Sequence, residues 1–386
     1  MQNNKLWKLL VIIAIPLLIS LCPAPEGLST LAWVLSGIYL AAIVGLVIKP
    51  FSEPVVLLIA VAASMVIVGN LGDGSIKAAS VLSGYSSGTT WLVFSAFTLS
   101  AAFVITGLGK RIAYILIGRI GSTTLGLGYV TAFLDLILAP ATPSNTARAG
   151  GIVLPIINSV AVALGSEPER SAKRVGHYLM LNIYMVTKTT SYMFFTAMAG
   201  NILALKMIED ICHIKLSWGG WALAAGLPGI IMLLLTPLIT YKLYPPELKR
   251  VDNKKIAQTG IDALGPMTVR EKMLSCLFVL ALGGWVFSSA LGVNESTVAI
   301  CVMALMLVLK IVTWDDVIKN KGGWNTLIWY GGIIGLSSLL SKVGFFVWLA
   351  EALKNNISFD GHGNVAFIVI VALSILVRYF FASGSA

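Results

Sequence analysis

Long apolar runs separated by short polar loops fill most of this chain. They predict helices near residues 7–22, 30–48, 54–69, 89–107, 219–241, 273–290, 294–312 and 324–341. A last apolar run begins near residue 365. A helix of about 20 apolar residues spans the hydrocarbon core of a bilayer, and most of these runs approach that length. None of them shows the period-two alternation of a barrel strand. The pattern therefore predicts an all-α polytopic membrane protein.

The segment 125–164 departs from this pattern. It consists of two apolar arms, Leu125 to Leu138 and Ile152 to Leu164, on either side of the polar stretch Pro140 to Gly151. Each arm is short for a span, and such lengths are typical of re-entrant segments or buried helices. Irregular backbone at membrane depth must be buried in protein or line a water-filled cavity, so we expect the tip, Ser144-Asn145-Thr146, to line one. A Pro-rich capped turn between two ordinary helices is the alternative.

The tip of this predicted hairpin has the chemistry of an anion site. The second arm begins there, and the first turn of a helix offers backbone N–H groups and the positive end of the helix dipole. Helix N-termini of this kind bind carboxylates and phosphates. The hydroxyls and the amide of Ser144, Asn145 and Thr146 add further hydrogen-bond donors.

A second departure lies in 175–205, which is too long for one straight span. Its middle is polar and small, with Thr189 to Tyr192 followed by Thr196, Ala197 and Met198. Unwound backbone there could supply carbonyl or N–H groups to the same cavity. The same residues could instead simply let two helices pack closely.

The amino-acid composition indicates that the chain lies in a membrane. Of its 386 residues 57% are hydrophobic and only 11% are charged, against about 25% charged in ordinary soluble domains, which predicts a lipid bilayer as partner. The net charge of +10 does not indicate nucleic acid, because the basic residues lie between apolar runs. With Lys5 and Lys8 in the cytoplasm most other basic residues also fall there, so we expect a cytoplasmic N-terminus. The scattered cysteines and histidines predict no metal site, and we expect no cofactor.

The polar stretch 242–272 divides the chain into two halves that repeat weakly. Gly88 and Gly109 fall on Gly323 and Gly344 at one constant offset, and a span, a short interfacial arm and a hairpin follow in that order in each half. The orientation from basic residues makes these repeats inverted, which places a transport site at the bilayer midplane. The expected organisation is scaffold helices over 1–69, a first repeat over 70–241, a cytoplasmic linker over 242–272 and a second repeat over 273–386.

Four charged residues fall inside predicted membrane segments, where charge is costly and usually functional: Asp135, Arg148, Lys188 and Arg378. One interpretation is that Asp135 pairs with Arg148 or Lys188 and ties the hairpin down. The other is that fixed positive charge near the tips attracts a dianion and repels a cation. Such a site would exchange one dianion for another without a co-transported cation.

The stretch from Ala139 to Ile152 resembles the first Ser-Asn-Thr signature of the divalent anion/sodium symporter superfamily. It is most similar to the branch of citrate/succinate and tartrate/succinate antiporters and plastid 2-oxoglutarate/malate translocators. Further stretches that resemble this branch are Gly107–Arg111, Leu216–Gly219, Tyr244–Pro246, Trp314–Asp316 and Arg378–Ser383. The resemblance implies a dimeric secondary transporter of di- or tricarboxylates in the inner membrane, with a scaffold domain and an elevator-type transport domain.

The resemblance also implies that two hairpin tips hold the substrate carboxylates. The first is Ser144-Asn145-Thr146, and the second reads Ser383, Gly384 and Ser385, which lacks the amide of the family pattern. Family members continue past the second tip, whereas this sequence stops at Ala386, so we expect a truncated chain that transports poorly by itself.

The segment Thr196 to Asn201 matches the broken helix of the family beside the first tip. Lys188 and Arg378 are candidates for replacing sodium by the charge argument, independently of any family motif. We therefore expect sodium-independent exchange, for example against succinate, with a sodium-coupled symporter and a non-transporting remnant as alternatives. An enzyme is disfavoured, because no Ser/His/Asp or metal-binding constellation lies in or beside the predicted spans.

Overall fold

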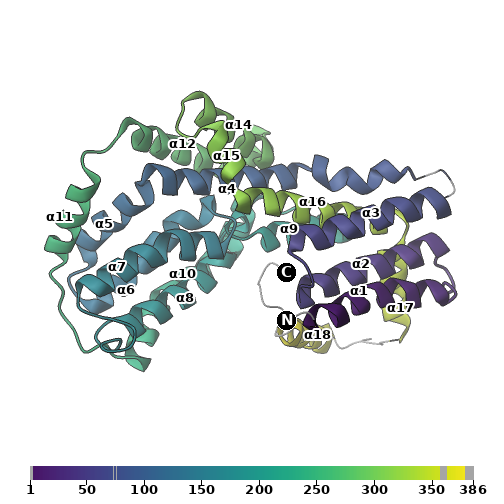
Figure 1. Ribbon diagram of the computed structural model, residues 1–386, viewed down its shortest axis with the longest axis horizontal. Helices are drawn as coiled ribbons and strands as arrows, with labels where there is room; N and C mark the ends of the chain where they lie inside the picture. Colours follow the sequence, from purple (N-terminus) through teal and green to yellow (C-terminus); the bar gives the residue numbers. More distant parts are fainter. Residues whose placement is uncertain (1–2, 73, 75, 357–362, 379–386) are drawn as a thin grey trace. The chain divides into compact units, whose positions relative to one another are not determined.

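The computed structural model describes residues 3–72, 74, 76–356 and 363–378, and the regular elements within them are helices (Figure 1). The first part of the chain forms α1 (Asn3–Leu21), α2 (Thr30–Ile48), α3 (Glu53–Leu71), the 3-10 helix η1 (Ala78–Ser86), α4 (Gly88–Thr106) and α5 (Leu108–Ile120). The middle forms α6 (Thr124–Leu138), η2 (Ala139–Ala141), the π-helical η3 (Thr146–Val153), α7 (Leu154–Ala163), α8 (Gly176–Met193), η4 (Phe195–Ala197), α9 (Ala199–Cys212) and α10 (Trp218–Leu243). The last part forms α11 (Asn253–Leu264), α12 (Val269–Val286), α13 (Ser288–Leu291), α14 (Glu295–Val308), α15 (Trp314–Lys319), α16 (Lys321–Lys342), α17 (Phe345–Asn356) and α18 (Gly363–Arg378).

Within the described residues, 6 helical segments are long and apolar enough to cross a membrane, and the bent pair α16–α17 would bring the number to 7. They are Thr30–Ile48, Glu53–Leu71, Gly88–Thr106, Thr124–Ala141, Thr146–Ala163 and Trp218–Leu243. The predicted all-α polytopic membrane fold is therefore confirmed. Helix α14 ends earlier than the predicted 294–312, because Lys310 has a left-handed φ of 52° that a right-handed helix cannot continue through.

The chain forms two compact units that interleave along the sequence. The first comprises Met1–Thr90, Lys206–Ile214 and Trp324–Ala386, and the second comprises Trp91–Leu205 and Lys215–Gly323. The first hairpin tip, Ser144 to Thr146, and the predicted broken helix 175–205 both lie in the second unit. This grouping by contacts does not test the division into repeats over 70–241 and 273–386, which stays a prediction.

A glycine with the same backbone conformation follows a long helix in each of the predicted halves. Gly107 follows α4 and Gly344 lies between α16 and α17, and both have a φ of 79°, a conformation that glycine adopts at little cost. A shorter amphipathic helix comes after each glycine, α5 in one half and α17 in the other. The correspondence of Gly109 with Gly344 at the predicted offset stays a prediction. The inverted orientation of the repeats stays a prediction.

In the first unit, η1 and α16 approach backbone to backbone. A Cβ atom added to Gly84 would lie 1.9 Å from the carbonyl oxygen of Gly331, and one added to Gly335 would lie 2.2 Å from that of Val81. Tyr85 secures the contact by donating its hydroxyl to the Ile328 carbonyl at 3.1 Å. Only glycine permits so close an approach of two backbones.

Gly84→Ala should therefore destabilise the protein. The added methyl group has to push η1 away from α16, and overpacking of this kind costs about 1–3 kcal/mol. Thermal unfolding of the detergent-solubilised protein measures the effect. Gly69→Ala in α3, where an added Cβ meets nothing within 4 Å, is the matched control and should leave the unfolding temperature unchanged or raise it. Equal melting of the two variants would rule out the close contact.

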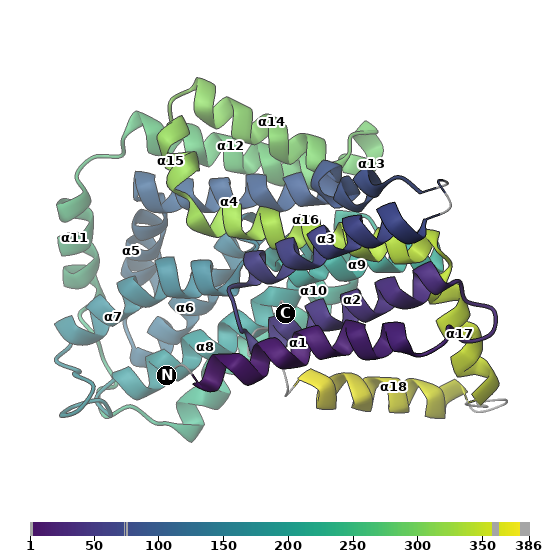
Figure 2. The ribbon, with the colours of Figure 1, turned by 45° about the vertical axis from the view of Figure 1, so that its right-hand side comes forward.

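In the second unit, helices α6, α8 and α10 lie side by side in both views (Figure 1 and Figure 2). Ala132, Val186 and Leu233 form an apolar cluster between them. The buried Asn182 amide links all three helices, since it donates to the Gly128 carbonyl at 3.0 Å and accepts from the Thr240 hydroxyl at 3.1 Å. These contacts hold α6, which carries Asp135, against α8, which carries Thr190 and Lys188.

The stretch 242–272, predicted as a polar linker, contains a helix that the sequence analysis did not expect. This helix, α11, packs along α5. The Asn253 amide at its start donates to the Ile117 and Gly118 carbonyls in the last turn of α5, at 2.9 and 2.8 Å. Glycine at position 260 leaves room for the Tyr114 ring. The helix thus gains its stability from α5 and not from an apolar run of its own.

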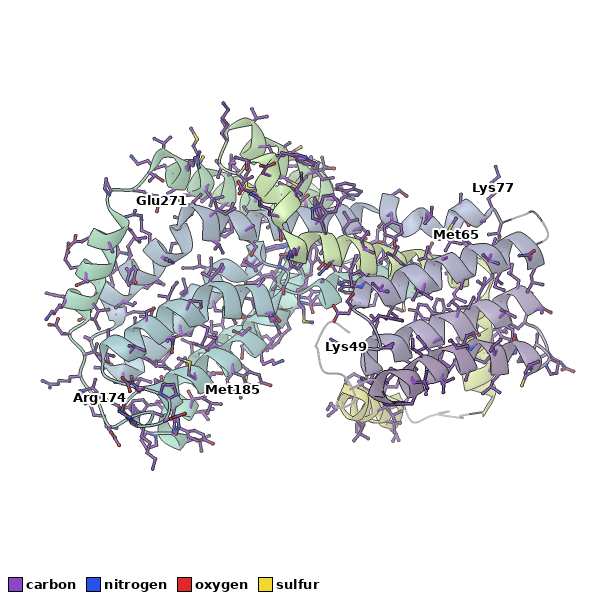
Figure 3. The ribbon with its side chains drawn as sticks, in the orientation of Figure 1. Lys49, Met65, Lys77, Arg174, Met185 and Glu271 are labelled. Atoms are coloured by element: carbon purple, nitrogen blue, oxygen red, sulfur yellow. The ribbon has the colours of Figure 1, made fainter. Side chains whose placement is uncertain are left out.

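Glu271, labelled in Figure 3, anchors the start of α12 to α5. Its carboxylate accepts from Arg111 Nε at 2.7 Å and Nη2 at 3.2 Å, and from the Thr268 backbone N–H at 2.7 Å. Burial by itself raises the pKa of Glu271, but the hydrogen bonds from Arg111 and Thr268 outweigh it and hold the pKa below the ordinary value of 4.5.

This lowered pKa predicts acid sensitivity. A depressed carboxylate pKa contributes stability that is fully present above pH 4.5 and is lost as the pH falls through the lower folded-state value. We expect Glu271→Gln to lower the free energy of unfolding by about 1.5–3 kcal/mol at pH 7, since it removes charged hydrogen bonds, and to flatten its decline below pH 4.5. Unfolding curves between pH 3 and 7 test this. An unchanged slope in the variant would contradict it.

Candidate functional site

Both arms of the first hairpin are longer than predicted. The 3-10 turn η2 extends the first arm to Thr124–Ala141, and the π-helical η3 opens the second as Thr146–Ala163, in place of 125–138 and 152–164. The length of the apolar runs did not predict the ends of the arms that face the tip, because η2 and η3 consist mainly of small and polar residues. By length and composition each arm could cross a membrane, so the re-entrant character of the hairpin stays a proposal.

The tip between these arms presents the three predicted residues at an accessible place. Ser144 and Asn145 are half-buried and Thr146 is exposed. The Ser144 hydroxyl accepts from the Ala147 backbone N–H at 3.3 Å, and the Ser144 carbonyl accepts from the Arg148 N–H at 3.0 Å. A hydroxyl that accepts one bond still has its own proton to donate. Ser144 can therefore cap the second arm and donate to a ligand at once.

The predicted broken helix is confirmed, with its break later than the sequence suggested. Thr189 to Tyr192 remain helical in α8, whereas Phe194 and Met198 are extended and enclose the short turn η4. Thr196 and Ala197 are fully buried in this turn. The Asn201 amide donates across the break, to the Ser191 carbonyl at 2.6 Å and to the Phe194 carbonyl at 3.2 Å, and so ties the end of α8 to the start of α9.

Arg148 joins the tip, the first arm and the broken helix. Its guanidinium is 0% exposed, and each of its five N–H donors has an acceptor. Nε donates to Asp135 Oδ1 at 3.0 Å, Nη1 to the carbonyls of Thr142 (3.0 Å) and Ala197 (3.1 Å), and Nη2 to Asn145 Oδ1 (3.1 Å) and Thr190 Oγ1 (3.1 Å). A second link between tip and break is the bond from the Ala199 N–H to the Pro143 carbonyl at 2.9 Å.

Asp135 pairs with Arg148, which decides between the two partners that the sequence left open. Its second oxygen accepts from the Thr190 hydroxyl, so both carboxylate oxygens are bonded and the side chain is 0% exposed. Lys188 lies outside this cluster: it is exposed on α8, with its Nζ 5.2 Å from the centre of the Tyr184 ring. Met185, labelled in Figure 3, is exposed on α8 as well.

The second tip, Ser383, Gly384 and Ser385, lies outside the described residues. Arg378 ends α18, and the described part of the structure gives no placement for its side chain. The second half of the predicted two-tip site and the predicted role of Arg378 therefore stay predictions.

Two tryptophans at the start of α10 hold the broken helix. Trp218 Nε1 donates to the Thr196 hydroxyl at 3.1 Å, and Trp221 Nε1 donates to the Tyr192 carbonyl at 2.9 Å. The Trp218 ring is stacked between Phe194 and Trp285, at centroid distances of 5.4 and 6.5 Å. Sequence reasoning gave these tryptophans no role. The inclusion of Trp218 in the family-like stretch Leu216–Gly219 was the one available signal.

The chain matches the model of a known membrane-transporter family. The family model described as the sodium:sulfate symporter transmembrane region matches residues 3–386. The chain belongs to the divalent anion/sodium symporter family. The resemblance noted at the Ser-Asn-Thr tip is thereby confirmed.

Several members of this family are similar to the chain over most of its length. The inner membrane protein YbhI of Escherichia coli (strain K12) is 80% identical over 100% of the chain and 81% of its own length. A Bacillus subtilis (strain 168) protein provisionally named as a malate transporter, YflS, is 39% identical over 92% of the chain and 73% of its own length. The L-tartrate/succinate antiporter of E. coli (strain K12) is 36% identical over 100% of the chain and 81% of its own length.

Proposed function

We propose that the protein is a secondary transporter that exchanges di- or tricarboxylates across the inner membrane without sodium. The names of the relatives, among them an inner membrane protein, a malate transporter and an L-tartrate/succinate antiporter, support carboxylates as the substrate class and the inner membrane as the location. The homodimer and the elevator-type movement implied by the family remain part of the proposal.

The first hairpin tip supports carboxylate binding. Ser144, Asn145 and Thr146 offer two hydroxyls and one amide at an accessible position. Hydroxyl and amide donors bind a carboxylate without needing a fixed countercharge in direct contact. The Ala197 carbonyl adjoins the tip, since it accepts from Arg148 Nη1 at 3.1 Å, and the Met198 sulfur lies 4.0 Å from Asn145 Nδ2. Thr196 precedes Ala197 in the same buried turn η4.

One observation carries the sodium-independent part of the proposal. Four oxygen atoms of the tip and of α8 and its break surround the guanidinium of Arg148, two accepting from its Nη1 and two from its Nη2. They are the carbonyls of Thr142 and Ala197, the amide oxygen of Asn145 and the hydroxyl of Thr190. Hard metal cations are bound by such oxygen sets. A resident guanidinium satisfies the same oxygens, so that these groups need no sodium ion.

This assignment differs from the sequence-based candidates for replacing sodium. Lys188 and Arg378 were expected in that role, yet Lys188 is exposed away from the oxygen cluster. Arg148 instead takes the position, and Asp135 compensates its charge at 3.0 Å. We therefore assign the cation-like role at the first tip to Arg148, and Arg378 stays the candidate at the second tip.

Exchange in proteoliposomes tests the proposal. Vesicles that contain the reconstituted protein are loaded with succinate, and uptake of labelled malate, tartrate and citrate is followed in sodium and in choline medium. We expect uptake that requires internal succinate and is equal in both media. Uptake into empty vesicles driven by a sodium gradient would instead favour sodium-coupled symport, the mode for which the family model is named.

A further inference from the structure

The amide of Asn145 has a defined orientation at the tip. Its Oδ1 accepts from Arg148 Nη2 at 3.1 Å. A guanidinium can only donate hydrogen bonds, so the side of the amide that faces Arg148 must be its oxygen. The Nδ2 group lies on the other side, where its neighbour is the Met198 sulfur at 4.0 Å, a weak acceptor.

We propose that Arg148 is a positioning residue that holds Asn145 with its NH2 group toward the substrate, and that it thereby makes the tip select a carboxylate over a carboxamide. This inference deepens the proposed function and rests on it. A carboxylate only accepts hydrogen bonds, so it needs donors from the tip. If the Asn145 amide turned by 180°, its oxygen would face the carboxylate and the two acceptors would repel each other.

Arg148 is suited to this task because it cannot turn itself. The planar guanidinium is buried, and the remaining four donors are engaged by Asp135, Thr142, Ala197 and Thr190. A planar fork held at several points presents each N–H in one direction. The bond to Asn145 is also charge-assisted, which polarises the amide and strengthens its NH2 group as a donor.

The experiment compares two ligands of nearly equal shape. Succinate carries two carboxylates, and succinamate carries one carboxylate and one carboxamide. Their dissociation constants are measured by isothermal titration calorimetry on the purified, detergent-solubilised protein. The readout is the ratio of the two constants, because a general loss of structure weakens both ligands alike whereas a reoriented amide changes their ratio.

The variants keep the net charge of the buried pair at zero. Arg148→Lys keeps a cation and donors beside Asp135, whereas the double variant Asp135→Asn with Arg148→Met removes both charges and every donor to Asn145. We expect the wild type to prefer succinate. The preference should fall roughly ten- to hundredfold in the double variant, as expected when a buried hydrogen bond no longer constrains its partner, and Arg148→Lys should retain part of it.

An equal loss of affinity for both ligands in the double variant, with the preference unchanged, would overturn the inference and leave the proposed function intact. Binding of neither ligand by the wild type would overturn both. If the double variant fails to fold, Arg148→Lys carries the test, because its ammonium keeps the charge beside Asp135 but lacks the planar fork that fixes the donor to Asn145. Its preference for succinate should be smaller than that of the wild type. A wild-type preference in that variant would refute the inference.

Discussion

Replacing Arg148 alone with methionine should lower the free energy of unfolding by about 3–5 kcal/mol, because it leaves the carboxylate of Asp135 buried without a countercharge. The side chains of both residues are 0% exposed, and their ion pair of 3.0 Å gives that carboxylate its only compensating charge among the described contacts. Asp135→Asn alone should cost a similar amount, since it strands the guanidinium. Thermal and denaturant unfolding of the detergent-solubilised protein measure both effects.

The double variant is the control for this prediction. Asp135→Asn combined with Arg148→Met leaves no unpaired charge, and the remaining cost comes from the Thr142 and Ala197 carbonyls that lose their donor, about 1–3 kcal/mol for an unsatisfied buried group. The double variant should thus be more stable than either single variant. Additive losses would mean that the two residues do not interact as the structure describes.

Asn145→Ala should abolish most substrate binding while leaving the fold in place. It removes the amide donors at the tip, and a hydrogen bond to a charged ligand contributes about 1.5–3 kcal/mol, equivalent to a roughly ten- to hundredfold weaker dissociation constant for succinate or malate. Exchange in proteoliposomes should fall by a similar factor at substrate concentrations below the dissociation constant. Calorimetry and initial uptake rates provide the measurements.

Asn158→Ala is the matched control for this effect, because it changes the same residue type on the exposed face of the same arm. It should bind and exchange like the wild type. If Asn158→Ala impaired exchange as strongly as Asn145→Ala, or if neither did, the tip would not be the binding site.

The sequence predicted the helices with good accuracy where burial in lipid dictates them. The predicted 30–48 is α2 itself, whose start is set by the Ser29 side chain capping the Ala32 N–H. The helix α11 was missed for the opposite reason, since its residues are largely polar and it is held by contacts with α5. A single sequence carries little signal for a helix of that kind.

At the site, the residue types were predictable and their pairings were not. The sequence indicated the Ser-Asn-Thr tip, but offered Asp135 both Arg148 and Lys188 as partners. The choice depends on the turn of α8, which buries Thr190 beside the pair and exposes Lys188. The position of the break likewise depends on tertiary contacts, with Trp218 stacked on Phe194 and Asn201 bonded across the gap.

Because all five N–H donors of the buried Arg148 guanidinium have acceptors, this residue also restricts how the site can evolve. Any one change that removes the charge of Asp135 or of Arg148 leaves the other charge stranded, whereas a joint loss of both charges does not. Descendants of this sequence are therefore expected to keep both residues or to lose both, through an intermediate that other mutations have first made more stable. Substitution of the exposed Lys188 leaves no buried charge without a partner. Arg148 and Lys188, the two positive charges of this region, therefore evolve under different constraints.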